Sequence, residues 1–252
     1  MNFSTPLIEG TLLKRYKRFF ADVEISVEGK KTTVLAHVPN TGSMKNCSDP
    51  GSTCLISKTD DPARKLQYTL QMVRSGKTWV GVNTANPNKL SKEAFEAKTF
   101  SHWKKYNSYA GEVKISDKSR VDMVLWKSSE SQPQKMRPQF PFDKKNSFHF
   151  VEVKNVTLAE KEIAQFPDAI SERALKHIEE LLELMKEGHT AELLFVVQRE
   201  DCEVFKPADH IDPKYGNALR KAQQKGLQIT AAICSLKPEK IALTPKTLSL
   251  EF

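Results

Sequence analysis

Short runs of strand-forming residues, separated by turn residues, fill the first third of the chain. The predicted strands are Leu7–Leu13, Phe19–Val27, Thr32–Val38, Thr53–Lys58, Leu66–Arg74 and Thr78–Val82. Short strands at regular spacing, with no long helical pattern between them, are typical of a small closed β-barrel. We predict an OB-like barrel over residues 1–86, because about five strands fit this length.

Strand and helix patterns alternate in the rest of the chain. Arg120–Trp126 and Phe148–Leu158 are predicted strands, and Ala191–Gln198 is a near-continuous apolar run of the kind found in buried central strands. Apolar residues at helical spacing follow Asp168, which is placed to cap a helix. A polar insertion, Lys127 to Ser147, has the composition of a mobile loop.

These patterns predict a mixed α+β protein with two domains. The barrel is followed by an α/β domain over residues 87–252, in which strands come before a helix, strand, helix, strand order. A short helix after Pro87 marks the expected boundary between the domains.

Charge is distributed unevenly along the 252 residues, whose formal net charge is +8. Residues 1–86 carry 12 basic and 7 acidic side chains, residues 87–147 carry 13 and 7, and residues 148–252 carry 14 and 17. Such an excess in the first two segments favours a polyanionic partner, nucleic acid first, since each neutralised phosphate releases counterions. A basic surface that only aids solubility is the alternative.

The chain has the features expected of a cytoplasmic protein. No apolar stretch approaches about 18 residues, and the residues after Met1 lack the layout of a signal peptide. The four cysteines are sparse and form no CxxC pair, which suits unpaired thiols in a reducing compartment. We expect no membrane partner. The sequence leaves open whether the protein associates with the nucleoid and whether it forms a homodimer.

One predicted strand carries two charges in an apolar frame. Glu152 and Lys154 are two residues apart, so they project from the same face. Asp122 lies inside the preceding apolar strand, and pairing of the two strands would bring it to the same point. Burying such charges is costly unless each has a partner or a metal.

Two carboxylates and a lysine form a recognisable set for phosphodiester cleavage. Carboxylate oxygens suit Mg²⁺, or Mn²⁺ in its place, and the metal activates water while lysine stabilises developing charge. An Asp followed by Glu-x-Lys on neighbouring strands is the minimal motif of the PD-(D/E)xK nuclease-like superfamily, in which the first helix often supplies a third carboxylate. Glu112 is the candidate for it. We therefore predict Glu112, Asp122, Glu152 and Lys154 as catalytic residues, and the three carboxylates as metal ligands. An ordinary Glu–Lys pair on an exposed strand is the alternative.

A second candidate stretch mixes cations with aromatic residues. Such a segment on an OB-like barrel combines phosphate contacts with base stacking, whereas a plain solvated turn is the alternative. The predicted DNA contacts are Lys14, Arg15, Tyr16, Lys17, Arg18, Arg64 and Lys65.

Several other polar residues are weaker candidates. The loop Asn40–Ser43 could offer backbone N–H groups to a phosphate, or be an ordinary turn. Helix residues beyond a Glu-x-Lys strand can reach the active site in nuclease-like folds, and a charge at the end of a buried strand often faces a cleft. The residues in these positions are Glu172, Arg173, Lys176, Gln198 and Arg199. The histidines show no ligand spacing.

Several strings along the chain together resemble one known family. They include Pro39-Asn40-Thr41-Gly42-Ser43-Met44, Phe150-Val151-Glu152-Val153-Lys154-Asn155-Val156-Thr157-Leu158 and Phe195-Val196-Val197-Gln198-Arg199. In residue types and in order along the chain, these strings resemble the sugar fermentation stimulation protein A family of prokaryotes. The resemblance covers nearly the whole chain.

The resemblance implies an OB-like barrel, a PD-(D/E)xK-type domain and DNA binding without marked sequence preference. The metal-site positions that the resemblance implies fall on Glu112, Asp122, Glu152 and Lys154, and all four residues are of the expected type. The insertion 127–147 is longer than the hairpin of the family. The family name implies a link to sugar metabolism of the maltose type. A non-catalytic DNA-binding regulator and an RNA-binding protein are the alternatives.

Overall fold

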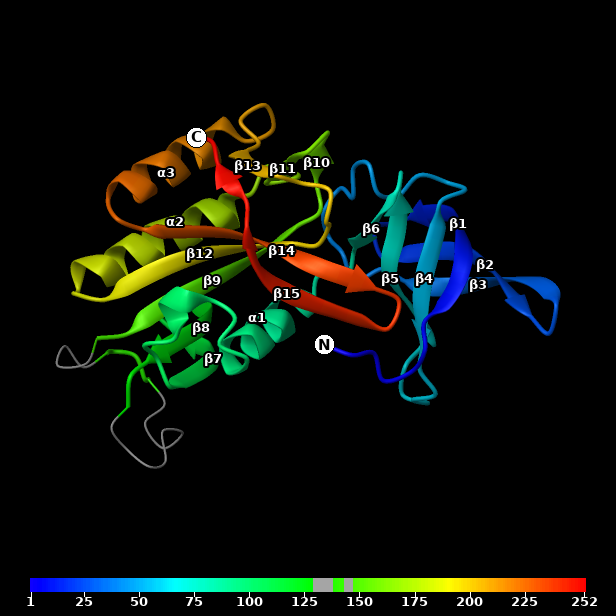
Figure 1. Ribbon diagram of the computed structural model, residues 1–252, viewed down its shortest axis with the longest axis horizontal. Coiled ribbons are helices and arrows are strands. Elements are labelled where there is room, and N and C mark those ends of the chain that lie inside the picture. The colour runs from blue at the N-terminus through cyan, green and yellow to red at the C-terminus, as the bar shows by residue number, and fades with distance from the viewer. Residues whose placement is uncertain (129–137, 143–146) are drawn as a thin grey trace.

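The computed structural model describes residues 1–128, 138–142 and 147–252. Most of the predicted insertion therefore lies outside the described residues. Figure 1 shows a β-barrel beside an α/β layer, so the predicted mixed fold is confirmed.

The first six strands form one sheet, in which β1 to β5 close into the barrel and β6 pairs with β5. They follow the order β3-β2-β1-β4-β5-β6, and an additional pairing of β3 with β5 closes the sheet on itself. Its interior is filled by small and medium apolar side chains, among them Leu12, Val23 and Leu70. The strands are β1 (Ile8–Tyr16), β2 (Phe20–Val27), β3 (Lys30–His37), β4 (Thr53–Lys58), β5 (Tyr68–Ser75) and β6 (Thr78–Gly81).

A second six-stranded sheet forms the centre of the α/β domain. Its order is β15-β14-β12-β9-β8-β7, and the three middle strands β14, β12 and β9 are parallel. Its strands are β7 (Ser108–Lys114), β8 (Arg120–Trp126), β9 (His149–Val156), β12 (Thr190–Val197), β14 (Gln228–Lys237) and β15 (Lys240–Thr247). A small sheet adds β10 (Ala159–Glu160), β11 (Ile163–Phe166), β13 (Val204–Pro207) and β16 (Ser249–Leu250).

Helices cover both faces of this sheet. On one face, α1 (Asn86–Glu96) packs Leu90 and Ala94 against the sheet, and the 3-10 turn η1 (Ser101–Trp103) follows it. On the other face lie α2 (Glu172–Lys186) and α3 (Pro213–Gln224), which contact each other. No helix in the described part of the chain is long and apolar enough to cross a bilayer.

The start of α2 differs from the prediction. Ser171, not Asp168, caps the helix, since its side chain accepts the Ala174 N–H at 3.1 Å. Asp168 instead accepts hydrogen bonds from the backbone N–H and the hydroxyl of Ser43, at 2.8 and 3.2 Å. The carboxylate thus ties a barrel loop to the segment that leads into α2.

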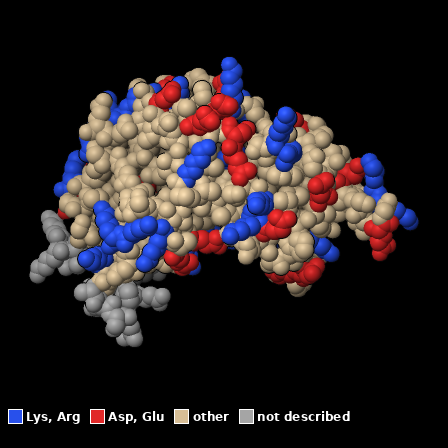
Figure 2. Space-filling model, viewed as in Figure 1, with Lys and Arg blue, Asp and Glu red and all other residues tan. Residues whose placement is uncertain are grey.

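Lys and Arg side chains gather on one part of the surface. Figure 2 shows such a group at the lower left, over the region of β7 and β8. This part of the chain belongs to residues 87–147, one of the two segments with a large basic excess.

Candidate functional site

Asp122 lies where β8 and β9 separate. The antiparallel ladder ends at the pair Met123–Val151, and Asp122 Oδ2 then accepts the backbone N–H of Val153 at 2.8 Å. The Asp122 carboxylate thus accepts the bond that a backbone carbonyl of β8 would accept if the ladder continued. Extending the register places Asp122 opposite Glu152, so the two predicted carboxylates do meet across neighbouring strands.

Glu152 is buried, with 4% of its surface exposed, and two cationic or polar side chains hold it. Lys154 Nζ donates to Glu152 Oε1 at 2.7 Å, and His177 Nδ1 of α2 contacts the same oxygen. The Lys154 and His177 nitrogens are 3.3 Å apart. Arg173 extends the chain of contacts, because its Nε donates to His177 Nε2 at 3.4 Å.

The pKa values of the two carboxyl groups shift in opposite directions. Burial and, after it, the charge of Glu152 raise the pKa of Asp122 to about 6, although hydrogen bonds from Val153 and Asn88 oppose this. Burial also acts upward on Glu152, but His177 and Lys154 outweigh it and lower its pKa below the ordinary value. A cation placed between the two groups would relieve the repulsion that Asp122 experiences.

Glu112 lies on β7 rather than on a helix, which corrects the expectation that the first helix supplies the third carboxylate. It is exposed, its φ of 53° is in the left-handed region, and the hairpin register places it opposite Asp122. Asn88 of α1 joins the two, since its Nδ2 donates to Asp122 Oδ1 at 2.9 Å and to Glu112 Oε1 at 3.4 Å.

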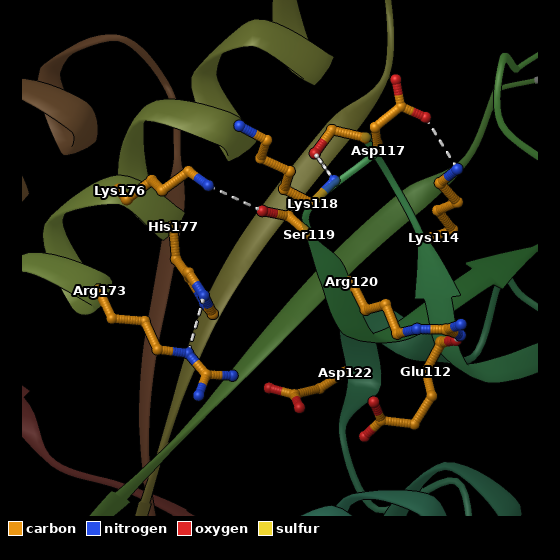
Figure 3. Close-up of a pocket in the computed structure, with 11 residues that line it drawn as sticks. Glu112, Lys114, Asp117, Lys118, Ser119, Arg120, Asp122, Arg173, Lys176 and His177 are labelled. Atoms are coloured by element: carbon orange, nitrogen blue, oxygen red, sulfur yellow. Dashed lines mark hydrogen bonds and ion pairs between the residues drawn. The ribbon is translucent and has the colours of Figure 1, made fainter.

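A cleft of about 700 Å³ opens above these carboxylates. Figure 3 shows Glu112 and Asp122 in the β7–β8 hairpin on one side, and side chains of α2 on the other. Exposed cations form the rim of this cleft: Lys114, Lys118, Arg120, Arg173 and Lys176. A cationic rim around the carboxylates of Glu112 and Asp122 suits a phosphodiester, because the rim attracts the backbone while the carboxylates can hold a metal.

The carboxylates fit a hard cation in type, but they are not assembled around one. In the described parts of the chain, no three His, Cys, Asp or Glu side chains form a group that could hold a metal as they stand. The reason is visible in their partners: Glu152 is bonded to Lys154 and His177, and Glu112 contacts Asn88. Oxygen ligands from Asp122 and Glu152 still match the preference of Mg²⁺.

The basic residues of the barrel have mixed roles. Lys14 is exposed on β1, Lys17 and Arg18 occupy the exposed β1–β2 turn, and Arg64 and Lys65 are exposed in the β4–β5 loop. Tyr16 donates to Asp22 at 3.1 Å and stacks on Phe20 with ring centroids 5.8 Å apart.

Arg15 differs from its neighbours because its guanidinium is occupied. It donates to the backbone oxygens of Asn40, Gly42 and Ser43 at 3.0, 2.9 and 2.9 Å. The Asn40–Ser43 loop is therefore shaped by Arg15, and its Ser43 N–H is directed at Asp168. The backbone N–H of Ser43, a candidate phosphate contact of this loop, thus already donates to the Asp168 carboxylate of the protein itself.

Gln198 and Arg199 face the junction of the domains and not the carboxylate cleft. Both are almost fully buried at the end of β12. Gln198 Nε2 donates to Asn155 Oδ1 at 2.6 Å, and its backbone oxygen accepts the Gly81 N–H of β6. Arg199 forms an ion pair with Asp201 and donates to Thr157 O. Gln198 thus connects the sheet with the barrel, whereas the bonds of Arg199 stay within the α/β domain.

Two residues of the site, Asn88 and His177, were not predicted from the sequence. His177 follows Ala174 by three positions and precedes Ile178, so helical spacing already places it beside a buried stripe. Arg173 and Lys176 reach the cleft as expected from their place on the helix after β9, whereas Glu172 is exposed and does not line it. Asn88 carries no sequence signal beyond its position in the first turn of a helix.

Comparison with known proteins covers nearly the whole chain. Residues 13–82 match the family model described as the SfsA N-terminal OB domain, and residues 85–240 match the sugar fermentation stimulation protein RE domain. A sugar fermentation stimulation protein homologue of Bdellovibrio bacteriovorus is 45% identical over 100% of both chains. One from Geobacter metallireducens is 44% identical over 98% of each.

The fold agrees with a solved relative. The structure of Pyrococcus furiosus SfsA in complex with Ca²⁺ superposes with a TM-score of 0.83 at 25% identity, covering 100% of this chain and 98% of the other. Matches to both family models, full-length identity above 40% and the shared fold lead to one assignment: the chain belongs to the sugar fermentation stimulation protein (SfsA) family.

Proposed function

We propose that this protein binds DNA without marked sequence preference and carries a Mg²⁺-dependent phosphodiesterase site in its α/β domain. The observation that carries the proposal is the meeting of half-buried Asp122 with buried Glu152 across two strands. Lys154 donates to Glu152, and Asp122 lines a cleft with a rim of exposed cations. Carboxylates at the base of the cleft repel a phosphate unless a cation lies between them. The cationic rim alone would bind the phosphate backbone of DNA. The carboxylates at the bottom of the cleft would require a metal ion before a phosphate could approach them.

Asp122 and Glu152 are the residues that would hold Mg²⁺, or Mn²⁺ in its place, with Glu112 nearby on β7. A metal bound there supplies charge neutralisation at the phosphate and a water of lowered pKa. The Ca²⁺ complex of the Pyrococcus furiosus relative supports a divalent cation in this family. Lys154, 2.7 Å from Glu152, is placed to stabilise charge that develops on the phosphate.

Phosphate binding would extend from the cleft to the barrel. Arg173 and Lys176 on α2 adjoin the segment that Asp168 ties to the barrel loop, and Lys14, Lys17 and Arg18 lie on the strand and turn next to Arg15. Exposed cations on both domains would contact the backbone, which positions nucleic acid without reading its sequence. Such binding suits a cytoplasmic protein that acts on DNA, and the family name links that action to sugar fermentation.

A second function is favoured by one specific contact. Glu152 already forms an ion pair with Lys154 and contacts His177, so its charge is balanced without a metal. A regulator that binds DNA and does not cleave it would keep the same contacts.

Cleavage of labelled single-stranded, duplex and flapped DNA with Mg²⁺ or Mn²⁺ tests the proposal. The wild type is compared with Asp122→Ala and Lys154→Ala, purified in parallel so that contaminating nucleases appear in all three preparations. Metal-dependent cutting that both substitutions abolish, with DNA affinity retained, would establish the nuclease. Salt-sensitive binding without cutting on any substrate would favour the regulator, whereas affinity that did not fall with added salt would contradict phosphate-dominated binding altogether.

A further inference from the structure

A second hollow lies at the opposite end of the β7–β8 hairpin from the carboxylates. It has a volume of about 480 Å³, and the residues that line it include four aromatic ones, which define the aromatic pocket: Phe95, Tyr106, Tyr109 and Trp126. They come from α1, the segment after η1, β7 and β8. Trp126 is 6% exposed and belongs to the core, whereas the other three are half-buried, so their rings are partly accessible at the hollow.

Cations surround these rings. Lys98 and Lys104 line the aromatic pocket, Lys92 Nζ lies 5.8 Å from the centre of the Tyr109 ring, and Lys105 Nζ lies 5.1 Å from that of Tyr106. The acidic side chain at the hollow, Glu96, is paired with Lys92 at 3.0 Å. Half-buried aromatic rings with ammonium groups over and beside them suit a ligand that combines a flat ring with a negative group.

The same two elements, β7 and α1, connect the aromatic pocket with the carboxylates. Tyr109 is three residues from Glu112 on β7, which corresponds to about 10 Å along a strand. On the neighbouring helix, Asn88 contacts Asp122 while Phe95 lines the aromatic pocket, again about 10 Å apart. A stacked strand covers that distance with about three nucleotides. Since β7 is an edge of the sheet, a nucleic acid strand can approach along it.

We propose that the aromatic pocket takes an unpaired nucleobase of the strand whose phosphate lies at Asp122. The inference rests on the proposed function and adds the substrate class: single-stranded nucleic acid, or a duplex with an unpaired end. Bases inside a duplex are stacked on one another and cannot reach side-chain rings without leaving the stack. The lysines at the pocket would contact the phosphates on either side of the bound base.

Binding of labelled oligothymidine to the full chain, in a chelating buffer that prevents cleavage, tests the inference. Tyr109→Ala is expected to weaken binding about 5- to 150-fold, the range for loss of one stacked base, while Tyr109→Phe keeps wild-type affinity. An oligonucleotide of the same length with abasic positions is expected to bind the wild type and Tyr109→Ala alike. Exposed Lys98→Gln and Lys104→Gln serve as variants that leave the core intact, and each is expected to reduce the salt dependence of binding.

The outcomes separate the two proposals. If Tyr109→Ala retains its circular dichroism spectrum and binds oligothymidine as tightly as the wild type, the aromatic pocket does not take a base. The same conclusion follows if abasic and intact oligonucleotides bind the wild type equally. If the wild type binds neither single-stranded nor duplex nucleic acid, the proposed function itself fails. Unchanged affinity of Tyr109→Ala for duplex DNA, with weaker binding of oligothymidine, would support both.

Discussion

Asp122 and Glu152 are carboxyl groups of neighbouring strands whose pKa values shift in opposite directions. Burial acts upward on both, and the difference comes from the side chains that face each one. Lys154 could be placed beside Glu152 from the sequence, because alternate residues of a strand share a face. His177 could not, since it reaches Glu152 from a helix 25 residues later in the chain. The ion pair was predictable, whereas its third member depends on tertiary packing.

A second buried carboxylate lies on the opposite face of the sheet. Glu192 of β12 is fully buried and accepts hydrogen bonds from Trp103 Nε1 at 2.8 Å, His149 Nε2 at 3.0 Å and His102 Nε2 at 3.2 Å. Burial acts upward, but the hydrogen bonds and charges of His102 and His149 lower the pKa of Glu192 to about 2. An apolar residue pattern around Ala191–Gln198 had indicated only a core strand. The partners that make a charge tolerable there come from η1 and β9.

Replacing Glu192 should change how stability depends on pH. Its pKa of about 2 in the folded protein lies below the ordinary value of 4.5. The stabilising contribution of the ionised carboxylate is therefore present above pH 4.5 and is lost as the pH falls toward 2. The wild type should therefore lose about 1.4 kcal/mol of this contribution per pH unit below 4.5, relative to Glu192→Gln. Urea unfolding of both proteins between about pH 6 and 3.5 measures the difference. A difference in unfolding free energy that stays constant across that range would contradict the assignment.

At the level of elements, the barrel strands were largely predictable and β7 was not. The predicted strand Thr53–Lys58 matches β4, and the alternation in Arg120–Trp126 matches β8. In β7, Ala110 and Val113 both enter the same core although they are three residues apart, a spacing typical of helices. The positive φ of Glu112 between them turns the strand and breaks the two-residue period. The irregularity that hides β7 in the sequence also directs Glu112 toward Asp122.

The link between the barrel loop and the start of α2 gives a prediction at this scale. A side chain on Gly42 would collide with the Asp168 carboxylate, which Ser43 holds. Gly42→Ala should therefore break that contact and lower the free energy of unfolding by about 1–3 kcal/mol. Asp168→Ala should cost a similar amount, and the double substitution should cost less than the sum, because both remove one contact.

Urea denaturation of the single and double variants measures this coupling. Gly111→Ala is a matched control, since a Cβ there meets its nearest atom, Asp122 O, at 3.7 Å and has room. Additive effects of Gly42→Ala and Asp168→Ala would show that the loop and the start of α2 are independent. The sequence analysis had assigned Asp168 to a helix cap because helix signals are local, and a partner 125 residues away leaves no trace in a local pattern.

In the whole molecule, two groups of cations belong to different domains. The cleft rim includes Lys114 and Lys118, and the barrel presents Lys14 and Lys17. The sequence groups Arg15 with the barrel cations as a phosphate contact, but its guanidinium donates to three backbone oxygens of the Asn40–Ser43 loop and holds that loop. The distribution of charge along the sequence indicated a polyanionic partner. Only the fold shows which cations are exposed and that the guanidinium of Arg15 is already hydrogen-bonded within the protein.

Charge reversal on each domain should therefore affect DNA of different lengths. A short oligonucleotide that fills the cleft should bind Lys114→Glu/Lys118→Glu more weakly and with a salt slope reduced by about two, whereas Lys14→Glu/Lys17→Glu should leave it unchanged. A long duplex contacts both groups, so each double variant should weaken its binding. Lys237→Glu/Lys240→Glu has the same net charge and lies at the tip of β14–β15, on the edge of the sheet opposite β7. If that control weakened binding as much as the cleft variant, the effect would come from total charge, and the cleft would have no special part in holding the backbone.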